Sequence, residues 1–257
     1  MVASSTARAQ MRAFATTLAR VSLFLLVTFM VLRAHAAHAE TRVTEDARGT
    51  SSSAGPEPKK RSVLAFPPEN RGGKQPVFIY LHGIAGGPER GCAELAHAVP
   101  TYGWLVCPHA NVRDGQKYSW GGSLAEQWAV VTQAVREVAS EPEVDPSAPV
   151  VLLGFSQGAY VAADLVTAYP NKIRAALFVG ASVRPQKDAL VRSGVKKVAF
   201  TAGLYDGTYG YLAESARLLA AAGYPAQFRS LGKVGHTYVG DPEARALDSL
   251  ISWMAND

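Results

Sequence analysis

The sequence is poor in cysteine, with only Cys92 and Cys107 among 257 residues. Two thiols are too few for a structural zinc cluster, and no pattern of histidines and carboxylates at metal-ligand spacing appears, so we expect no metal and no cofactor. In an oxidising compartment such a pair suggests a disulfide. Cys92 falls near the start of a predicted helix and Cys107 at the end of the next strand, which in a βαβ unit lie at one edge of the sheet. We predict a Cys92–Cys107 bridge; the alternative is two small buried apolar side chains.

The sequence also lacks, near its N-terminus, an apolar run long enough to cross a bilayer. Residues 21–32 are apolar, but twelve residues are too few, and Arg20 blocks extension backwards. A basic segment precedes this run, and the small-x-small sequence at 37–39 follows it, which is typical of a secretory signal peptide. We therefore expect residues 1–39 to be removed and the protein to be exported, periplasmic or extracellular, with no stable membrane anchor; an uncleaved anchor is the alternative.

Residues 40–257 carry almost no net charge. The whole chain has a net charge of +5. Four of its basic residues are arginines in residues 1–39, which contain no acidic residue, so 22 basic and 21 acidic residues remain after position 39. This balance does not suggest nucleic acid or an anionic membrane as a partner. Residues 40–61 are polar and are predicted to form a flexible leader, and residues 62–257 have the length of a single domain. No internal repeat appears, and we expect a monomer or a small homo-oligomer.

Predicted strands and helices alternate from residue 62 onward, with one long irregular loop at 108–122. This alternation predicts an α/β fold with a mainly parallel, doubly wound sheet of about seven strands and helices on both faces. The loops of interest all follow strands, so they should meet at the carboxyl edge of the sheet. The expected strands are 62–66, 75–81, 104–107, 150–153, 173–181, 196–201 and 227–231, and the expected helices are 91–99, 123–140, 159–169, 208–222 and one that starts at Asp241-Pro242.

The sequence Gly154-Phe-Ser156-Gln-Gly158 organises this pattern. A buried strand precedes it, and a helix follows that Pro170 ends. A strand, a tight turn with a serine between glycines, and a helix are the context of a nucleophile elbow. We therefore predict that Ser156 is a nucleophile; the alternative is a structural serine in a glycine-rich loop.

A serine hydroxyl needs a base within hydrogen-bond reach, and the base needs an acid that fixes its tautomer. His236 follows the last predicted strand in a glycine-rich loop, and Asp206 follows the strand before it. Hydrolases with this elbow carry serine, acid and histidine in that chain order. We predict His236 as the base and Asp206 as the acid. Asp188 is the alternative acid, in which case Asp206 would only cap its helix.

The remaining histidines of the predicted domain are less suitable bases. His97 falls in the middle of a predicted helix, and we interpret it as structural. His82 and His109 follow strands that precede the nucleophile, which does not fit the expected order.

The oxyanion of an acyl-transfer intermediate needs two backbone N–H donors. One should be Gln157, directly after the nucleophile. The other should come from the loop that begins His82-Gly83, with Ile84 as first choice and Ala85 as second. An ordinary glycine-rich turn between a strand and a helix is the alternative for this loop.

Leu81-His82-Gly83, the elbow, Asp206 and Gly235-His236, in this order, resemble the α/β-hydrolase fold. The sequence Gly-Phe-Ser-Gln-Gly-Ala is similar to the phospholipase/carboxylesterase group, which includes acyl-protein thioesterases, and to esterases of the dienelactone-hydrolase and polyhydroxyalkanoate-depolymerase types. The resemblance covers nearly all of residues 62–257. It implies Ser156, Asp206 and His236 as catalytic residues, with Ile84 and Gln157 as oxyanion donors.

Together these features predict an exported serine hydrolase that cleaves carboxylic esters or thioesters through an acyl-enzyme. The alternatives are a peptidase or amidase, an acyltransferase, and a non-catalytic binding protein on the same fold. Residues 181–196 leave no room for a large cap domain, so we expect an open site for a small-molecule or lipid-like ester. Aromatic residues on the edge loops are predicted to line the acyl pocket, with ordinary packing as the alternative: Tyr118, Trp120, Tyr205, Tyr209 and Tyr238.

Overall fold

The computed structural model describes residues 63–239 and 245–256. The predicted signal peptide, the predicted leader and the predicted start of the last helix at Asp241-Pro242 lie outside these residues.

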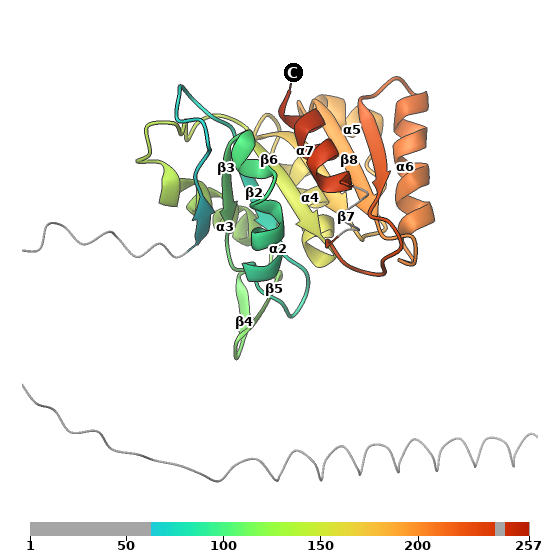
Figure 1. The fold of residues 1–257 in the computed structure, drawn as a ribbon, viewed down its shortest axis with the longest axis horizontal. Helices are drawn as coiled ribbons and strands as arrows, with labels where there is room; N and C mark the ends of the chain where they lie inside the picture. Colours follow the sequence, from blue (N-terminus) through green and yellow to red (C-terminus); the bar gives the residue numbers. More distant parts are fainter. Residues whose placement is uncertain (1–62, 240–244, 257) are drawn as a thin grey trace, which may run out of the picture. The chain divides into compact units, whose positions relative to one another are not determined.

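The main sheet has seven strands in the order β1-β3-β2-β6-β7-β8-β9 (Figure 1). Only β1, at the edge, is antiparallel to its neighbour; the other pairs are parallel. This confirms the predicted mainly parallel sheet of about seven strands. The strands are β1 (Leu64–Phe66), β2 (Val77–Leu81), β3 (Trp104–Cys107), β6 (Val150–Phe155), β7 (Ile173–Val179), β8 (Lys197–Ala202) and β9 (Ala226–Ser230).

Helices cover both faces of the sheet because its five inner strands are buried on both sides over most of their length. In β2, Phe78 and Tyr80 face the cluster that contains α2 and α7, whereas Ile79 and Leu81 face the cluster with α3, α4, α5 and α6. Figure 1 shows α2 and α7 in front of the sheet. The helices are α2 (Glu89–Leu95), α3 (Leu124–Val138), α4 (Gln157–Ala168), α5 (Lys187–Arg192), α6 (Tyr209–Ala221) and α7 (Ala246–Ala255), with a short 3₁₀ helix, η1 (Val99–Thr101).

Local signals in the sequence account for where several helices begin and end. The Ser123 hydroxyl accepts a hydrogen bond from the Glu126 N–H, and the Glu126 carboxylate accepts one from the Ser123 N–H, so α3 starts with a capping box. Gly223, at φ 76°, follows the end of α6. Among the described helices, none combines the length and the apolar character that a membrane span requires.

The predicted helix at 91–99 is wrong in its extent. The helix α2 ends at Leu95, and η1 begins at Val99. Pro100 explains the break, because proline has no N–H to donate to the carbonyl of Ala96, four residues earlier, so α-helical hydrogen bonding cannot continue there. His97 therefore lies exposed in a turn and not inside a helix.

The predicted irregular loop at 108–122 contains a hairpin that projects downward from the coloured domain in Figure 1. Its strands β4 (Val112–Asp114) and β5 (Lys117–Ser119) pair antiparallel around a two-residue turn. Gly115, at φ 60°, takes the first turn position, where a type II′ turn has its glycine. The hairpin is mostly exposed and polar, so the alternation of apolar and polar residues that marks a half-buried strand is absent.

A disulfide joins Cys92 of α2 to Cys107 at the end of β3. Both cysteines are fully buried. The bond therefore fastens α2 to the sheet at the point where the loop after β3 begins.

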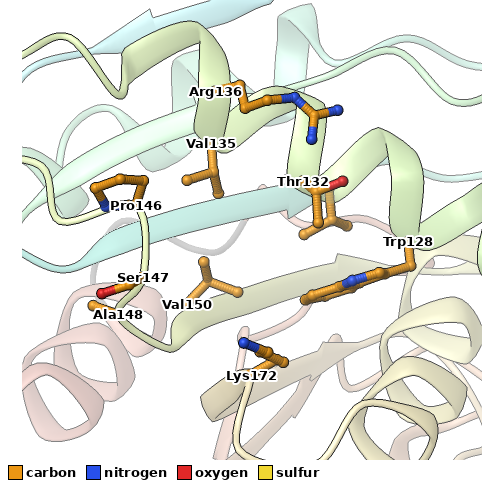
Figure 2. A pocket seen from close by; sticks show the side chains of 10 residues that line it. Trp128, Thr132, Val135, Arg136, Pro146, Ser147, Ala148, Val150 and Lys172 are labelled. Atoms are coloured by element: carbon orange, nitrogen blue, oxygen red, sulfur yellow. The ribbon is translucent and has the colours of Figure 1, made fainter.

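A cavity of about 240 Å³ opens between α3 and the start of β6 (Figure 2). Trp128, Val135, Val150 and Lys172 are among the residues that line it. Val150 is the first residue of β6, and Ser156 follows the last one. A strand rises about 3.3 Å per residue, so roughly 20 Å separate this cavity from the elbow. The cavity lies at the amino edge of the sheet, away from the loops that carry the predicted site.

The disulfide should contribute measurably to stability. Closing a loop of 15 residues in the unfolded chain is worth about 3 kcal/mol. We expect a variant with both Cys92→Ala and Cys107→Ala to melt about 6–12 °C below the oxidised wild type in a thermal denaturation experiment. Reductant should lower the melting temperature of the wild type and leave that of the double variant unchanged. A wild type that is insensitive to reductant after full unfolding and refolding in its presence would contradict the prediction.

Candidate active site

Ser156 lies in a strained turn between β6 and α4, at φ 52° and ψ −117°. Non-glycine residues rarely adopt positive φ, and such strain persists only where the surroundings enforce it. Gly154 and Gly158 permit this turn. A Cβ on Gly154 would lie 2.6 Å from the Cα of Ala159, and one on Gly158 would lie 2.0 Å from the carbonyl oxygen of Leu81. The helix therefore packs against both its own strand and the end of β2, and the serine is left at the strand tip.

His236 connects Ser156 to Asp206. Its Nε2 lies 3.0 Å from the Ser156 Oγ, and its Nδ1 lies 2.8 Å from the Asp206 Oδ2. An ionised carboxylate only accepts hydrogen bonds, so Nδ1 carries the proton and Nε2 is free to accept the serine proton. The structure thus brings the three predicted residues into one hydrogen-bonded chain, although 80 residues separate the serine from the histidine.

Asp206 is held as a carboxylate. Burial alone would raise its pKa, but the N–H and hydroxyl of Thr208 and the ring of His236 all donate to it, and these bonds hold the pKa below its ordinary value. One oxygen binds Thr208, just before α6, and the other orients the histidine. Asp206 thus holds the turn before α6 with one oxygen and orients His236 with the other. Asp188, the alternative acid, is exposed in the first turn of α5.

The loop that carries His236 is fastened to the loop that carries Asp206. The N–H groups of Leu204 and Tyr205 donate to the carbonyls of Gly232 and Val234, at 2.8 and 3.0 Å. A Cβ on Gly203 would lie 2.1 Å from the Val234 carbonyl oxygen, so only glycine permits this approach. The relative position of His236 and Asp206 is therefore set by main-chain contacts.

Sequence reasoning missed Gly180, which follows β7. It has φ 61°, and a Cβ there would lie 3.1 Å from the His236 Cε1 and 3.2 Å from the Asp206 Oδ2. Gly180 thus forms the wall against which the Asp206 and His236 side chains pack. The only signal in the sequence is a small residue directly after a strand that neighbours the elbow strand.

His82 is buried and structural. Its Nε2 accepts the N–H of Ala110 at 3.0 Å, which leaves the proton on Nδ1, and Nδ1 donates to the Gly83 carbonyl at 2.8 Å. Burial lowers the pKa of His82, so the ring stays neutral. Both ring nitrogens are occupied, and the ring ties the loop after β2 to the loop after β3.

The loop after β2 lies directly beside the serine. A Cβ on Gly83 would come within 3.3 Å of the Ser156 Cβ. Ile84, the first-choice oxyanion donor, follows it and is 64% exposed. The N–H of Ala85, the second choice, donates to the Ser119 hydroxyl at 2.9 Å and is therefore already in use. Gln157 is the first residue of α4, and the first N–H of a helix has no acceptor within the helix.

The aromatic residues predicted to line the pocket lie in different surroundings. Trp120 is only 5% exposed and packs in the core, and its buried indole N–H donates to the His82 carbonyl. The Tyr118 ring stacks on His109, and Tyr209 packs against Phe228 on α6 and β9. Tyr238 packs edge-on against Phe155, which in turn lies against His236. Tyr205 is 68% exposed beside Asp206.

Metal-ligating side chains do not gather at the site. Within residues 63–239 and 245–256, no group of three or more histidine, cysteine, aspartate and glutamate side chains is placed to hold a metal ion.

No protein-family model and no curated protein matches this chain. Many solved structures match it in fold. The esterase PE8 is 19% identical over 76% of this chain and 98% of that chain, with a TM-score of 0.54. A carboxylesterase from Bacillus cereus is 19% identical over 76% and 94%, with a TM-score of 0.53. The fluorophosphonate-binding serine hydrolase F of Staphylococcus aureus, with substrate bound, is 14% identical over 77% and 93%, with a TM-score of 0.53.

These likenesses extend over nearly the full length of each matched protein. They agree with the strand order, the parallel pairing and the helices on both faces of the sheet. The chain therefore has the α/β-hydrolase fold, as the sequence predicted.

Proposed function

We propose that this protein is a serine hydrolase that cleaves carboxylic esters, with Ser156 as nucleophile, His236 as base and Asp206 as acid. The observation that carries the proposal is the hydrogen-bonded chain from the Ser156 Oγ through His236 to Asp206, on a strained turn at the carboxyl edge of the sheet. A serine hydroxyl is activated by a base that a third group orients, and the strained turn exposes the hydroxyl at the strand tip.

In the proposed reaction, His236 takes the proton of Ser156 as the oxygen attacks the ester carbonyl. The negative charge that develops on the carbonyl oxygen is stabilised by the N–H groups of Ile84 and Gln157. His236 then protonates the leaving alcohol, and an acyl-enzyme remains. Water repeats the same steps and releases the acid, while Asp206 stabilises the charged ring throughout.

The structures that share the fold support the proposal. Two of them are named as an esterase and a carboxylesterase, and a third as a serine hydrolase that binds fluorophosphonate. Fluorophosphonates react with activated serines, so such a probe is a direct test for Ser156 as well.

We further propose that the protein is exported. Residues 1–39 have the pattern of a secretory signal peptide. The Cys92–Cys107 disulfide fits an oxidising compartment, because disulfides persist there and are rare in the cytosol.

The substrate we propose carries apolar groups next to the ester. Large apolar side chains are exposed on the loops that meet at the site: Ile84 after β2, Leu204 and Tyr205 after β8, and Val239 after β9. The strand β2, which precedes Ile84, lies on one side of the elbow strand β6, and β8 and β9, which precede the other three residues, lie on its opposite side. Apolar surface is thus available to both the acyl and the alcohol part.

Removal of the Ser156 hydroxyl tests the nucleophile. We expect Ser156→Ala to lose hydrolysis of p-nitrophenyl esters by at least about 10⁴-fold and to lose labelling by a fluorophosphonate probe completely, because no nucleophile remains. Circular dichroism should match the wild type. Labelling that persists in the variant, or a folded wild type that turns over anilides but no esters, would rule out the proposal.

Replacement of each candidate acid by asparagine, in separate variants, tests the role of Asp206. In Asp206→Asn an oxygen remains for Thr208, but the amide N–H cannot accept from His236 Nδ1, so the ring adopts the tautomer that cannot take the serine proton. We expect kcat to fall about 10⁴-fold with little change in melting temperature. Asp188→Asn is the matched control and should keep wild-type kcat, since Asp188 is exposed on α5. The reverse ranking of the two variants would make Asp188 the acid.

A chain-length profile tests the apolar surface. Burial of one methylene is worth about 0.8 kcal/mol, so kcat/KM for p-nitrophenyl esters should rise by up to about fourfold per methylene from acetate to hexanoate. Leu204→Ser combined with Tyr205→Ser should flatten this profile and leave acetate turnover within about twofold. Leu218→Ser, an exposed apolar residue near the end of α6, should leave the profile unchanged. A flat wild-type profile would contradict the proposed substrate class.

A further inference from the structure

Residues 118–120, which we call the strap, form the end of the β4–β5 hairpin and lead toward α3. They contact both of the backbone segments that carry the proposed oxyanion donors. One of these segments is the loop 82–86, which contains Ile84, and the other is the start of α4, which contains Gln157.

The strap fastens the loop 82–86 at three points. The main chains of Tyr118 and Gly86 exchange two hydrogen bonds, at 2.8 and 3.1 Å. The Ala85 N–H donates to the Ser119 hydroxyl at 2.9 Å, and the Trp120 indole N–H donates to the His82 carbonyl at 2.9 Å. These bonds lie on both sides of Ile84 in the sequence.

Side chains therefore fix the two peptide planes that flank Ile84. The C=O and the N–H of a trans peptide point in opposite directions in one plane. His82 Nδ1 donates to the Gly83 carbonyl, which directs the Ile84 N–H away from that ring. Ser119 accepts the Ala85 N–H and so fixes the next plane, at a residue with φ 51°. Removal of the Ser119 hydroxyl would therefore leave the N–H of Ala85, a residue at positive φ, without the acceptor that fixes its direction.

The strap also binds the segment with the second donor. The Gln157 side-chain oxygen accepts a hydrogen bond from the main-chain N–H of Trp120, and the Gln157 amide nitrogen donates one to the main-chain carbonyl of Trp120, both at 2.9 Å. Trp120 is buried, so the strap is anchored in the core at this point. Gln157 thus contributes its main-chain N–H to the site and its side chain to the strap.

We infer that the strap sets the separation and direction of the two oxyanion donors, with Ser119 and the Gln157 side chain as positioning residues. The inference rests on the proposed hydrolase function. Its physical basis is that donors stabilise an oxyanion only when they are held in advance at hydrogen-bond distance, and a misplacement of about 1 Å is costly. The hairpin outside the sheet is therefore part of the catalytic apparatus.

The test removes one side-chain contact of the strap at a time, on each side of the site, and keeps both oxyanion donors. Ser119→Ala deletes the acceptor for Ala85, and Gln157→Met keeps the size of the side chain but loses both bonds to Trp120. Loss of a donor costs about 10²–10³-fold, so a donor that is present but loosely held should cost about 10-fold in kcat, with KM within about twofold. Ser119→Thr keeps the hydroxyl and should restore kcat.

The matched control is Asn111→Leu. The Asn111 side chain forms the same pair of bonds with the main chain of Gly121, next to the strap, but does not bond to loop 82–86 or to Gln157. It should lower the melting temperature and keep kcat within about twofold. A hairpin that acts only through stability would lower kcat in both variants in proportion to their loss of melting temperature.

Affinity for a trifluoromethyl ketone, which forms an oxyanion with the serine, supplies the second measurement. In Ser119→Ala and Gln157→Met this affinity should fall in proportion to kcat/KM, whereas Asn111→Leu should bind as the wild type does. Unchanged kcat and ketone affinity in both strap variants, or an equal loss in Asn111→Leu, overturns the inference alone. A wild type that neither hydrolyses esters nor binds the ketone overturns the proposed function, and the inference falls with it.

Discussion

The close approach of three main-chain segments around Ser156 is the constraint on which the site depends. The strand β6, the helix α4 and the end of β2 meet at distances that leave no space for a Cβ on Gly154 or Gly158. This packing holds Ser156 at positive φ, because relaxation of the turn would separate the helix from the sheet. The energy of the surrounding core, with β2 and most of β6 buried, maintains a conformation that the isolated turn would not keep.

Around this fixed point, the other groups are positioned by contacts between loops. Parallel strands deliver their carboxyl ends to one edge, so the loops after β2, β6, β8 and β9 meet there. Main-chain hydrogen bonds then join the loop of Asp206 to that of His236, and the strap joins loop 82–86 to Gln157. Gly180 forms a close wall beside the Asp206 and His236 side chains. The site is thus built from main-chain contacts more than from side-chain packing.

The predictions that the structure confirms and those that it contradicts differ for one physical reason. Periodic burial and glycine spacing are local, so the strands, the α3 capping box and the elbow were predictable. The β4–β5 hairpin lacked the apolar alternation of a strand, and Pro100 ended the helix region earlier than the apolar residues suggested. Trp120 looked like a pocket residue because it is aromatic and in an edge loop, but its burial depends on contacts with His82 and Gln157, which are 38 and 37 residues away.

The sequence by itself determined the fold class, the elbow and the order of the candidate nucleophile, acid and base, because these follow from patterns within a few residues and from the chain order that a parallel sheet imposes. Only the tertiary structure decided that the Asp206 carboxylate, and not that of Asp188, faces His236, that His82 is occupied on both nitrogens, and that Ala85 donates its N–H to Ser119. Each of these depends on the direction of a hydrogen bond between distant segments, and no local pattern encodes that direction.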